Sequence, residues 1–270
     1  MTNLIKSSFY KLIRDWTFRI TLIVGAALAV FMCLLYLGID LLSGPDQLGS
    51  MCNGYQFYTS SLSPTQNFGL TVPINLIVFT IGEFNCGTIR NKIIAGNKKS
   101  LIYLSLIITG IIFTLTLMAV YFALSVGLST LIGGFSGKNM VVDTNLLYQY
   151  PIMGLCTYIF IVTLAILVSS SIRNIGGSMP IVIIGILLLY FLAFVPSITR
   201  LVSDTKEMTT GMLIQQWVNP LYGFGSLGIA GVVNFKMETT TFVASIVTPL
   251  YWSIILVIGG IVIFNKKDVK

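Results

Sequence analysis

The chain contains no histidine, and charged residues are scarce in it. Only 9% of its 270 residues are Asp, Glu, Lys or Arg, whereas a soluble domain carries about 25% of these residues. Hydrophobic residues make up 55% of the chain, and its mean hydropathy is +0.90. This balance excludes an ordinary soluble domain and indicates an integral membrane protein.

The chain also lacks paired cysteines. Its four thiols stand apart, without a C-x-x-C pair, at Cys33, Cys52, Cys86 and Cys156. Without histidine or paired cysteine, the sequence does not favour a zinc site. Intramembrane proteolysis would need a Ser–His pair, two buried aspartates or zinc, and those parts are missing. We therefore expect no enzymatic site and no cofactor in this chain.

One glycine-rich stretch, 133–138, resembles a phosphate loop only superficially. Ile132 occupies the position of the first glycine, and Asn139 stands where Ser or Thr would bind magnesium. The stretch is expected to form a loop turn outside the cell. The chain is not expected to hydrolyse ATP unaided.

Six hydrophobic runs are candidates for membrane spans, because a membrane helix needs about 20 mainly apolar residues. They are approximately Phe18–Leu42, Leu70–Gly82, Leu101–Ile132, Pro151–Ser171, Met179–Pro196 and Phe242–Phe264. The second run is short and is expected to start nearer Gln66. The first is too long and begins too late for a cleavable signal peptide. The sequence thus predicts one all-α integral membrane domain over 1–270, with six transmembrane helices.

The basic residues predict the orientation. With the N-terminus in the cytoplasm, only Lys138, Arg200, Lys206 and Lys236 of the 16 Lys and Arg residues fall outside. The positive-inside rule then places both termini in the cytoplasm, in a multi-pass protein of the cell membrane. Because the basic residues sit just beyond membrane ends, we expect membrane lipid as a partner and no nucleic acid.

Residues 1–17 predict an interfacial helix that lies flat before the first span. Apolar and small side chains recur there at helical spacing, at Leu4, Ile5, Ser8, Phe9, Leu12, Ile13 and Trp16. Two interpretations remain open. The helix is either a simple anchor or a lever that touches a cytoplasmic partner.

A short basic segment, 83–99, separates the second and third runs. Thr88 is placed to cap a short helix there, and Gly96 to end it. The helical spacing predicts one apolar ridge, and polar side chains elsewhere around the helix. The ridge consists of Ile89, Ile93 and Ile94, and the polar residues are Arg90, Asn91 and Lys92. Such a helix suits a groove in a partner protein; the alternative is that the isoleucines rest on lipid.

None of the predicted spans carries a charged residue near its middle. Glu83 comes closest, at the cytoplasmic end of the second span. Ion-coupled transporters and proton pumps usually need an intramembrane charge to bind or relay the coupling ion. The sequence therefore favours a membrane pathway whose energy comes from elsewhere.

In this segment Glu83 is followed by Gly87-Thr88-Ile89-Arg90-Asn91-Lys92, then by Gly96 and a basic pair. This pattern resembles the first cytoplasmic loop of export-type ABC permeases. These form the type-2 integral membrane family, whose bacterial members move peptides, drugs, glycans or lipids. The resemblance implies that Gly87–Gly96 is a coupling helix docked on a nucleotide-binding ATPase subunit, which holds ATP and magnesium. It also implies that Glu83 is a polar hinge and that a second permease subunit, identical or related, completes the pathway. The residues assigned to ATPase coupling are Glu83, Gly87, Thr88, Ile89, Arg90, Lys92, Ile93 and Gly96.

The extracellular segment 197–241 contains an apolar part, Met212–Val233, that Asn219-Pro220 and several glycines interrupt. It predicts short re-entrant or interfacial helices before the last span; an ordinary folded loop is the alternative. In the family such elements cap the exit of the pathway. The candidates for an extracellular gate are Trp217, Asn219, Pro220, Tyr222 and Phe224. The other outer loop, Asp40–Gly69, is expected to form an ordered polar cover.

The resemblance favours a permease subunit of an ATP-driven ABC exporter. Its expected substrate is amphipathic or hydrophobic, a peptide first and a lipid or drug next, since the spans lack charge. The alternative is a non-transporting membrane immunity or assembly factor that acts by lateral protein binding. A third possibility is a passive channel, which would conduct without nucleotide.

Overall fold

The computed structural model describes residues 2–43, 51–64, 69–136, 144–203, 210–223 and 239–267. Every regular element in these ranges is an α-helix. The long helices are α2 (Trp16–Ser43), α6 (Lys99–Gly133), α7 (Thr144–Ile172), α8 (Ile175–Ser203) and α11 (Thr239–Lys266). The short ones are α1 (Thr2–Arg14), α3 (Gly54–Leu62), α4 (Thr71–Asn85), α5 (Thr88–Ile94) and α9 (Thr210–Val218).

The five long helices are each long and apolar enough to cross a membrane. The bent pair of α4 and α5 would make a sixth span if the two helices together form one broken span. A lone helix satisfies its own backbone hydrogen bonds, which is why such apolar sequences form helices in lipid. The prediction of an all-helical multi-pass membrane protein is therefore confirmed. At nearly every end, the observed helix extends beyond the apolar run from which its span was predicted.

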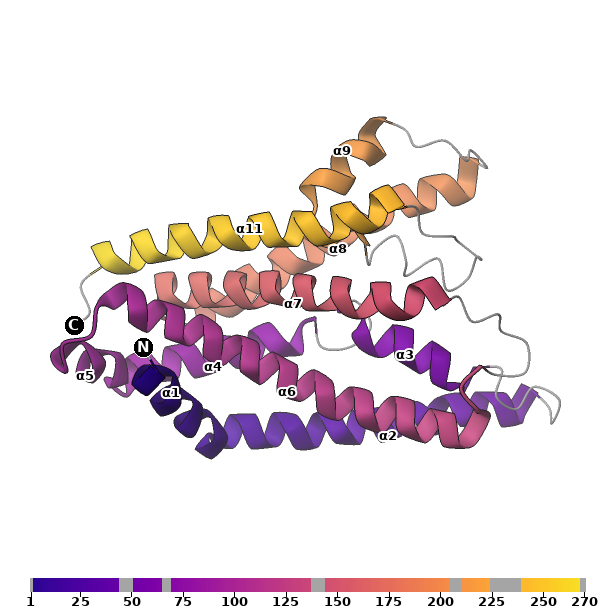
Figure 1. The fold of residues 1–270 in the computed structure, drawn as a ribbon, viewed down its shortest axis with the longest axis horizontal. Helices are drawn as coiled ribbons and strands as arrows, with labels where there is room; N and C mark the ends of the chain where they lie inside the picture. The colour runs from indigo at the N-terminus through magenta and orange to yellow at the C-terminus, as the bar shows by residue number, and fades with distance from the viewer. Residues whose placement is uncertain are drawn as a thin grey trace.

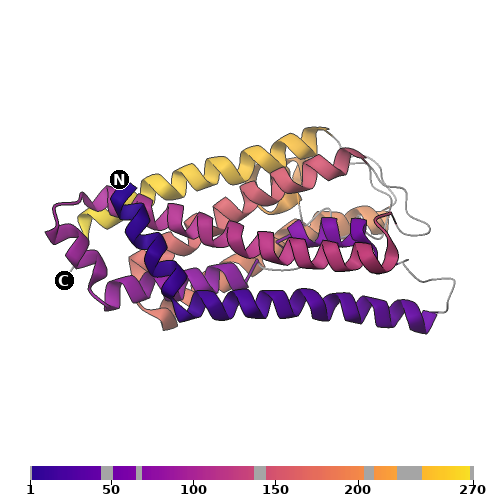
Figure 2. The same ribbon diagram turned by 60° about the horizontal axis from the view of Figure 1, so that its bottom comes forward.

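The helices form an elongated bundle with α6 and α7 at its centre (Figure 1). The most apolar stretches of α6 and α7 are 61% and 67% buried, whereas those of α2, α8 and α11 are 17%, 22% and 22% buried. In both views α11 runs along α7 and α2 runs along α6 (Figure 2). The outer helices thus leave most of their apolar surface to face lipid or another protein.

The second span is shorter than the sequence suggested. Its helix, α4, begins at Thr71 rather than near Gln66, and it has 15 residues; it is therefore about 22 Å long, below the hydrocarbon thickness of about 30 Å. The helix α3 packs against the same neighbours, α6 and α7, toward the opposite end of the bundle (Figure 1). The expected polar cover is thus, in its described part, a helix set into the bundle.

Local capping explains where α3 begins and where α1 passes into α2. Asn53 Oδ1 accepts a hydrogen bond of 2.8 Å from the Gln56 backbone N–H, so it caps α3. Asp15 is the single residue between α1 and α2, and its Oδ1 accepts from the Thr17 backbone N–H at 3.0 Å. The expected N-terminal helix is therefore present, and it meets the first long helix at an angle (Figure 2).

One end of the bundle gathers α1, α5, the turn between α7 and α8, and the last turn of α11 (Figure 1). We call it the termini end, because both chain termini lie there. Eleven basic residues sit on these elements, on the first turn of α2 and at the start of α6, namely Lys6, Lys11, Arg14, Arg19, Arg90, Lys92, Lys98, Lys99, Arg173, Lys266 and Lys267. The topology thus brings to one end the basic residues that the sequence assigned to one side of the membrane.

Candidate functional site

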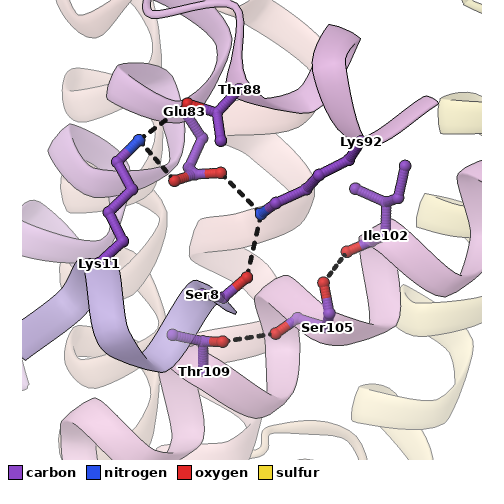
Figure 3. Close-up of polar contacts among 8 residues, drawn as sticks. All are labelled: Ser8, Lys11, Glu83, Thr88, Lys92, Ile102, Ser105 and Thr109. Atoms are coloured by element: carbon purple, nitrogen blue, oxygen red, sulfur yellow. Dashed lines mark hydrogen bonds and ion pairs between the residues drawn. The ribbon is translucent and has the colours of Figure 1, made fainter. Parts of the chain in front are cut away.

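A buried carboxylate joins three helices at the termini end. Glu83 lies in the last turn of α4 and is fully buried. Its Oε1 lies 2.6 Å from Lys11 Nζ on α1, and its Oε2 lies 2.9 Å from Lys92 Nζ on α5 (Figure 3). Lys92 is itself buried, whereas the Lys11 side chain is 37% exposed. The single acidic group therefore holds one cation from each neighbouring helix.

Two hydroxyls complete this cluster. Lys92 Nζ donates to Ser8 Oγ on α1 at 3.0 Å, and Lys11 Nζ donates to Thr88 Oγ1 on α5 at 3.0 Å (Figure 3). Ser8 and Lys11 are three residues apart, so they share one face of α1. We call the five residues Ser8, Lys11, Glu83, Thr88 and Lys92 the Glu83 clamp. It links α1 to α5 directly as well as through α4.

The energetics of the clamp favour a rigid unit. Removing a carboxylate or an ammonium from water costs several kcal/mol, and the cost is offset only where partners and hydrogen bonds are well placed. Loss of one buried partner leaves an uncompensated charge and costs about 3–5 kcal/mol. Any motion that separates α5 from α4 would have to break the pair between Lys92 and Glu83. We infer that α1, α4 and α5 move together.

Two glycines in left-handed conformations bound α5. Gly87 has φ +66° at the start of the helix, and Gly96 has φ +84° just after its end. Gly96 N–H donates to Ile93 O at 2.9 Å and Asn97 N–H donates to Lys92 O at 3.3 Å, the two bonds of a Schellman motif. The prediction that Gly96 ends the helix is confirmed.

The prediction that Thr88 caps α5 is wrong. Gly87 occupies the cap position, where no side chain donates or accepts a capping bond, and Thr88 is the first helical residue. The Thr88 hydroxyl instead accepts the bond from Lys11. The helix is also shorter than the segment 83–99 suggested, with only 7 residues, at a bend of 55° to α4.

The three isoleucines do not form one ridge. Ile89 is fully buried and Ile93 packs against the same core, but Ile94 is 73% exposed. Positions four apart share a helix face, whereas a residue five positions on from Ile89 is rotated by about 140°. Lys92 also points inward, not to a polar rim. The exposed side of the helix, here the α5 outer face, consists of Arg90, Asn91 and Ile94.

The gate candidates lie on and after α9, which packs on α8 and α11 rather than near the clamp. Asn219 is buried at the end of α9; its Nδ2 donates to Leu189 O on α8 at 2.9 Å, and its Oδ1 accepts from Leu221 N–H at 3.0 Å. Pro220 and Tyr222 are buried as well, whereas Trp217 is 46% exposed. Phe224 lies outside the described residues.

Several Ser and Thr hydroxyls in the centre of the bundle are satisfied within their own helix. Ser105 Oγ donates to Ile102 O and Thr109 Oγ1 donates to Ser105 O, each at 2.7 Å, within α6 itself (Figure 3). Ser169 of α7 follows the same pattern. Such back-bonded hydroxyls present little polarity to a neighbour. They therefore do not supply a polar lining for a water-filled path.

Sequence reasoning missed Ser8 and Lys11 as partners of Glu83. A partial signal was present, because the interfacial helix carries a hydroxyl and a lysine three residues apart. The sequence could not place that face against the end of α4, since nothing local specifies the contact. The cluster has a structural and mechanical role, because its charged groups are paired with one another. It does not expose a nucleophile or an acid.

The sequence was compared with known protein families and curated proteins. No curated protein matches it. One family matches residues 46–270, described as "Protein of unknown function (DUF2705)". The matched part includes Glu83 and Lys92 and excludes α1, which contributes Ser8 and Lys11. Because the match covers most of the chain, this protein belongs to the DUF2705 family.

Proposed function

We propose that this chain is the membrane subunit of an ATP-driven exporter of the ABC type, and that the α5 outer face docks on a separate nucleotide-binding ATPase. The observation that carries the proposal is the construction of α5. It is a short helix bent out of the bundle between two left-handed glycines, with Arg90, Asn91 and Ile94 turned away from the chain. An exposed apolar side chain beside a cation and an amide suits a groove in a partner.

The Glu83 clamp gives this face a mechanical role in the proposal. A displacement of α5 would be transmitted to α4 through the ion pair between Lys92 and Glu83. It would be transmitted to α1 through the contacts of Ser8 and Lys11. Two discrete, packed arrangements of these helices would then be selected by the nucleotide state of the partner. In this scheme the interfacial helix is a lever, and the termini end faces the cytoplasm, as its basic residues favour.

The proposed cargo is amphipathic or hydrophobic. The buried carboxylate of Glu83 is paired with two cations, Lys11 and Lys92, so it offers no free negative charge. Ser and Thr hydroxyls of α6 and α7, such as those of Thr109 and Ser169, are bonded within their own helices. These features support an apolar peptide, a lipid or a drug over an ion or a sugar. A second permease subunit would pair with this one around the path, and α9 with Asn219-Pro220 would be a re-entrant element near its exit.

Charge reversal at Arg90 tests the proposal. The tagged full chain is purified from its native membranes, and co-purifying proteins are identified by mass spectrometry. An ATPase with a phosphate loop is expected with the unaltered chain, and Arg90→Glu and Ile94→Asp should each remove most of it. Lys98→Glu is the matched control, because Lys98 is an exposed cation at the same end but outside α5.

The outcome separates this function from its alternatives. Full ATPase retention in both α5 variants, with normal membrane insertion, would overturn the docking assignment. Capture of a partner without any nucleotide-binding motif would favour an immunity or assembly factor. Flux through liposomes that contain the chain alone, without ATP, would favour a channel.

A further inference from the structure

A cavity opens on the side of the bundle away from α1 and the Glu83 clamp. Its volume is about 490 Å³, within the range of about 300–1,000 Å³ typical of ligand sites. The wall combines α7, α8, α9 and α11, with Leu188, Leu189 and Leu192 on one side and Trp252 and Leu256 on another. Nearly all lining side chains are apolar, so water is a poor occupant.

The cavity lies at membrane depth. Leu188 and Leu192 belong to the stretch of α8, and Trp252 to the helix α11, that are long and apolar enough to cross a bilayer. At its edge Leu188 is 54% exposed and Ile214 of α9 is 60% exposed. The opening therefore faces the surface that lipid would cover, and an apolar chain can enter from the side.

A glycine leaves the cavity unfilled. Gly185 lines it, and a Cβ built there would meet no atom within 4 Å. A side chain added at this position would thus begin in open space at the cavity wall. The opposite wall is held in place, since Trp252 Nε1 donates to Val218 O at 2.8 Å and so ties α11 to the end of α9.

One polar atom in the wall is unpaired. Gln215 lines the cavity, and its Oε1 is buried without a hydrogen-bond partner among the residues that the structure describes. A buried acceptor without a donor costs about 1–3 kcal/mol, so the site suits a ligand that brings a donor. The neighbouring polar residue, Asn219, already has partners for both amide atoms.

We propose that this cavity binds one acyl chain of a membrane phospholipid, and that a hydroxyl of the lipid head group donates to Gln215 Oε1. The site combines a lateral opening, an apolar wall and a single acceptor, which are the parts that an amphiphile with a hydroxylated head requires. It stands independently of the ATPase partner proposed above, because none of its lining residues belongs to α1, α4 or α5.

Photolabelling of the full chain in vesicles tests the site. The probes are phosphatidylglycerol and phosphatidylmethanol, each with a diazirine in one acyl chain; both are anionic, but only the former has head-group hydroxyls. In the unaltered chain, label from phosphatidylglycerol should concentrate on α8 and α9 around Leu188 and Ile214. Gly185→Phe should reduce that label roughly tenfold, equivalent to ~1.4 kcal/mol of binding. Gly127→Phe is the matched control, since Gly127 also has open space but lies on α6, outside the cavity.

A second comparison in the same experiment tests the contact between the lipid head group and Gln215. The unaltered chain should take more label at this site from phosphatidylglycerol than from phosphatidylmethanol, and Gln215→Leu should abolish that preference. Label on the exposed Phe31 of α2 serves as the internal reference for folding and for general lipid contact. Equal labelling of α8 and α9 in Gly185→Phe and the unaltered chain would overturn the proposal. So would crosslinking of two copies through Ile214→Cys, because a second chain would then cover the opening.

Discussion

Lys92 Nζ lies 2.9 Å from Glu83 Oε2, across the 55° bend between α5 and α4, and both side chains are buried. The cation therefore turns back from the projecting helix into the end of the preceding one. This contact closes the bend, and Ser8 on α1 accepts a second hydrogen bond from the same ammonium. The shape of the termini end depends on this pair more than on the helix propensity of a seven-residue segment.

Neutralising Glu83 should destabilise the protein strongly. In Glu83→Gln the carboxylate that faces Lys92 is gone, and Lys92 becomes a buried cation without a counter-charge. The expected loss is about 3–5 kcal/mol, as for other broken buried pairs. Unfolding in detergent by denaturant, followed by circular dichroism, measures the change.

The double variant Glu83→Gln with Lys92→Met supplies the control. Removing both members of the pair should recover a large part of the stability, because no unpaired charge stays in the interior. Strictly additive losses in the two single variants and the double variant would show that Glu83 and Lys92 do not interact in the native protein.

Alanine at either boundary of α5 should weaken the helix ends. Gly87 and Gly96 have positive φ, and a side chain in that conformation costs about 1–2 kcal/mol. Neither site has an atom within 4 Å of an added Cβ, so the loss would come from the backbone alone. Gly82→Ala is the matched control: it has the same open space within α4, and there alanine should be neutral or stabilising. Thermal unfolding of the three variants ranks them, and equal behaviour would contradict the left-handed boundaries.

Cysteine labelling should report the side of the membrane on which α5 lies. Cys86, in the turn before α5, is exposed, whereas Cys33, Cys52 and Cys156 are buried. A membrane-impermeant maleimide should therefore modify Cys86 in inside-out vesicles and leave intact cells unlabelled. Cys86→Ser should remove the signal. Labelling of Cys86 in intact cells would place the termini end outside.

The same labelling, carried out on the detergent-solubilised chain so that the reagent reaches both ends of the bundle, has a defined pH dependence. Burial raises the pKa of the Cys52 thiol to about 11, with Cys33 and Asp40 adding to the shift. The thiolate is the reactive form, so a raised pKa keeps Cys52 protonated and unreactive as the pH rises from 7 to 9. Cys86→Ser should thus stay unlabelled over that interval, as measured by intact-protein mass. Labelling of Cys52 at pH 9 would contradict its burial.

The long helices could be predicted from the sequence, because apolar runs of membrane length leave few alternatives. The interfacial helix at 1–17 and the glycine that ends α5 also follow from local patterns. The half-length helix α3 does not, since Gly54–Leu62 is mixed in character. Its apolar face is explained only by the tertiary structure, in which α3 packs against α6 and α7 beyond the end of α4.

The candidate site was predicted only in part, for a reason of geometry. The segment pattern identifies Glu83 and a short helix after it, but the direction in which each face of that helix points depends on the bend. The bend turns Ile89 and Lys92 inward and leaves Ile94 outside. The partner residues Ser8 and Lys11 come from a segment more than 70 residues away, and their contact is a tertiary one.

The central claim is that a separate ATPase subunit binds the α5 outer face. Site-specific crosslinking tests it most directly: in a Cys86→Ser background, Ile94→Cys carries a short thiol-reactive photocrosslinker, and native membranes are irradiated with and without ATP. The account predicts an adduct to a polypeptide with a phosphate loop, whose yield changes with nucleotide. Adducts to lipid alone, in membranes that contain such an ATPase, would contradict it.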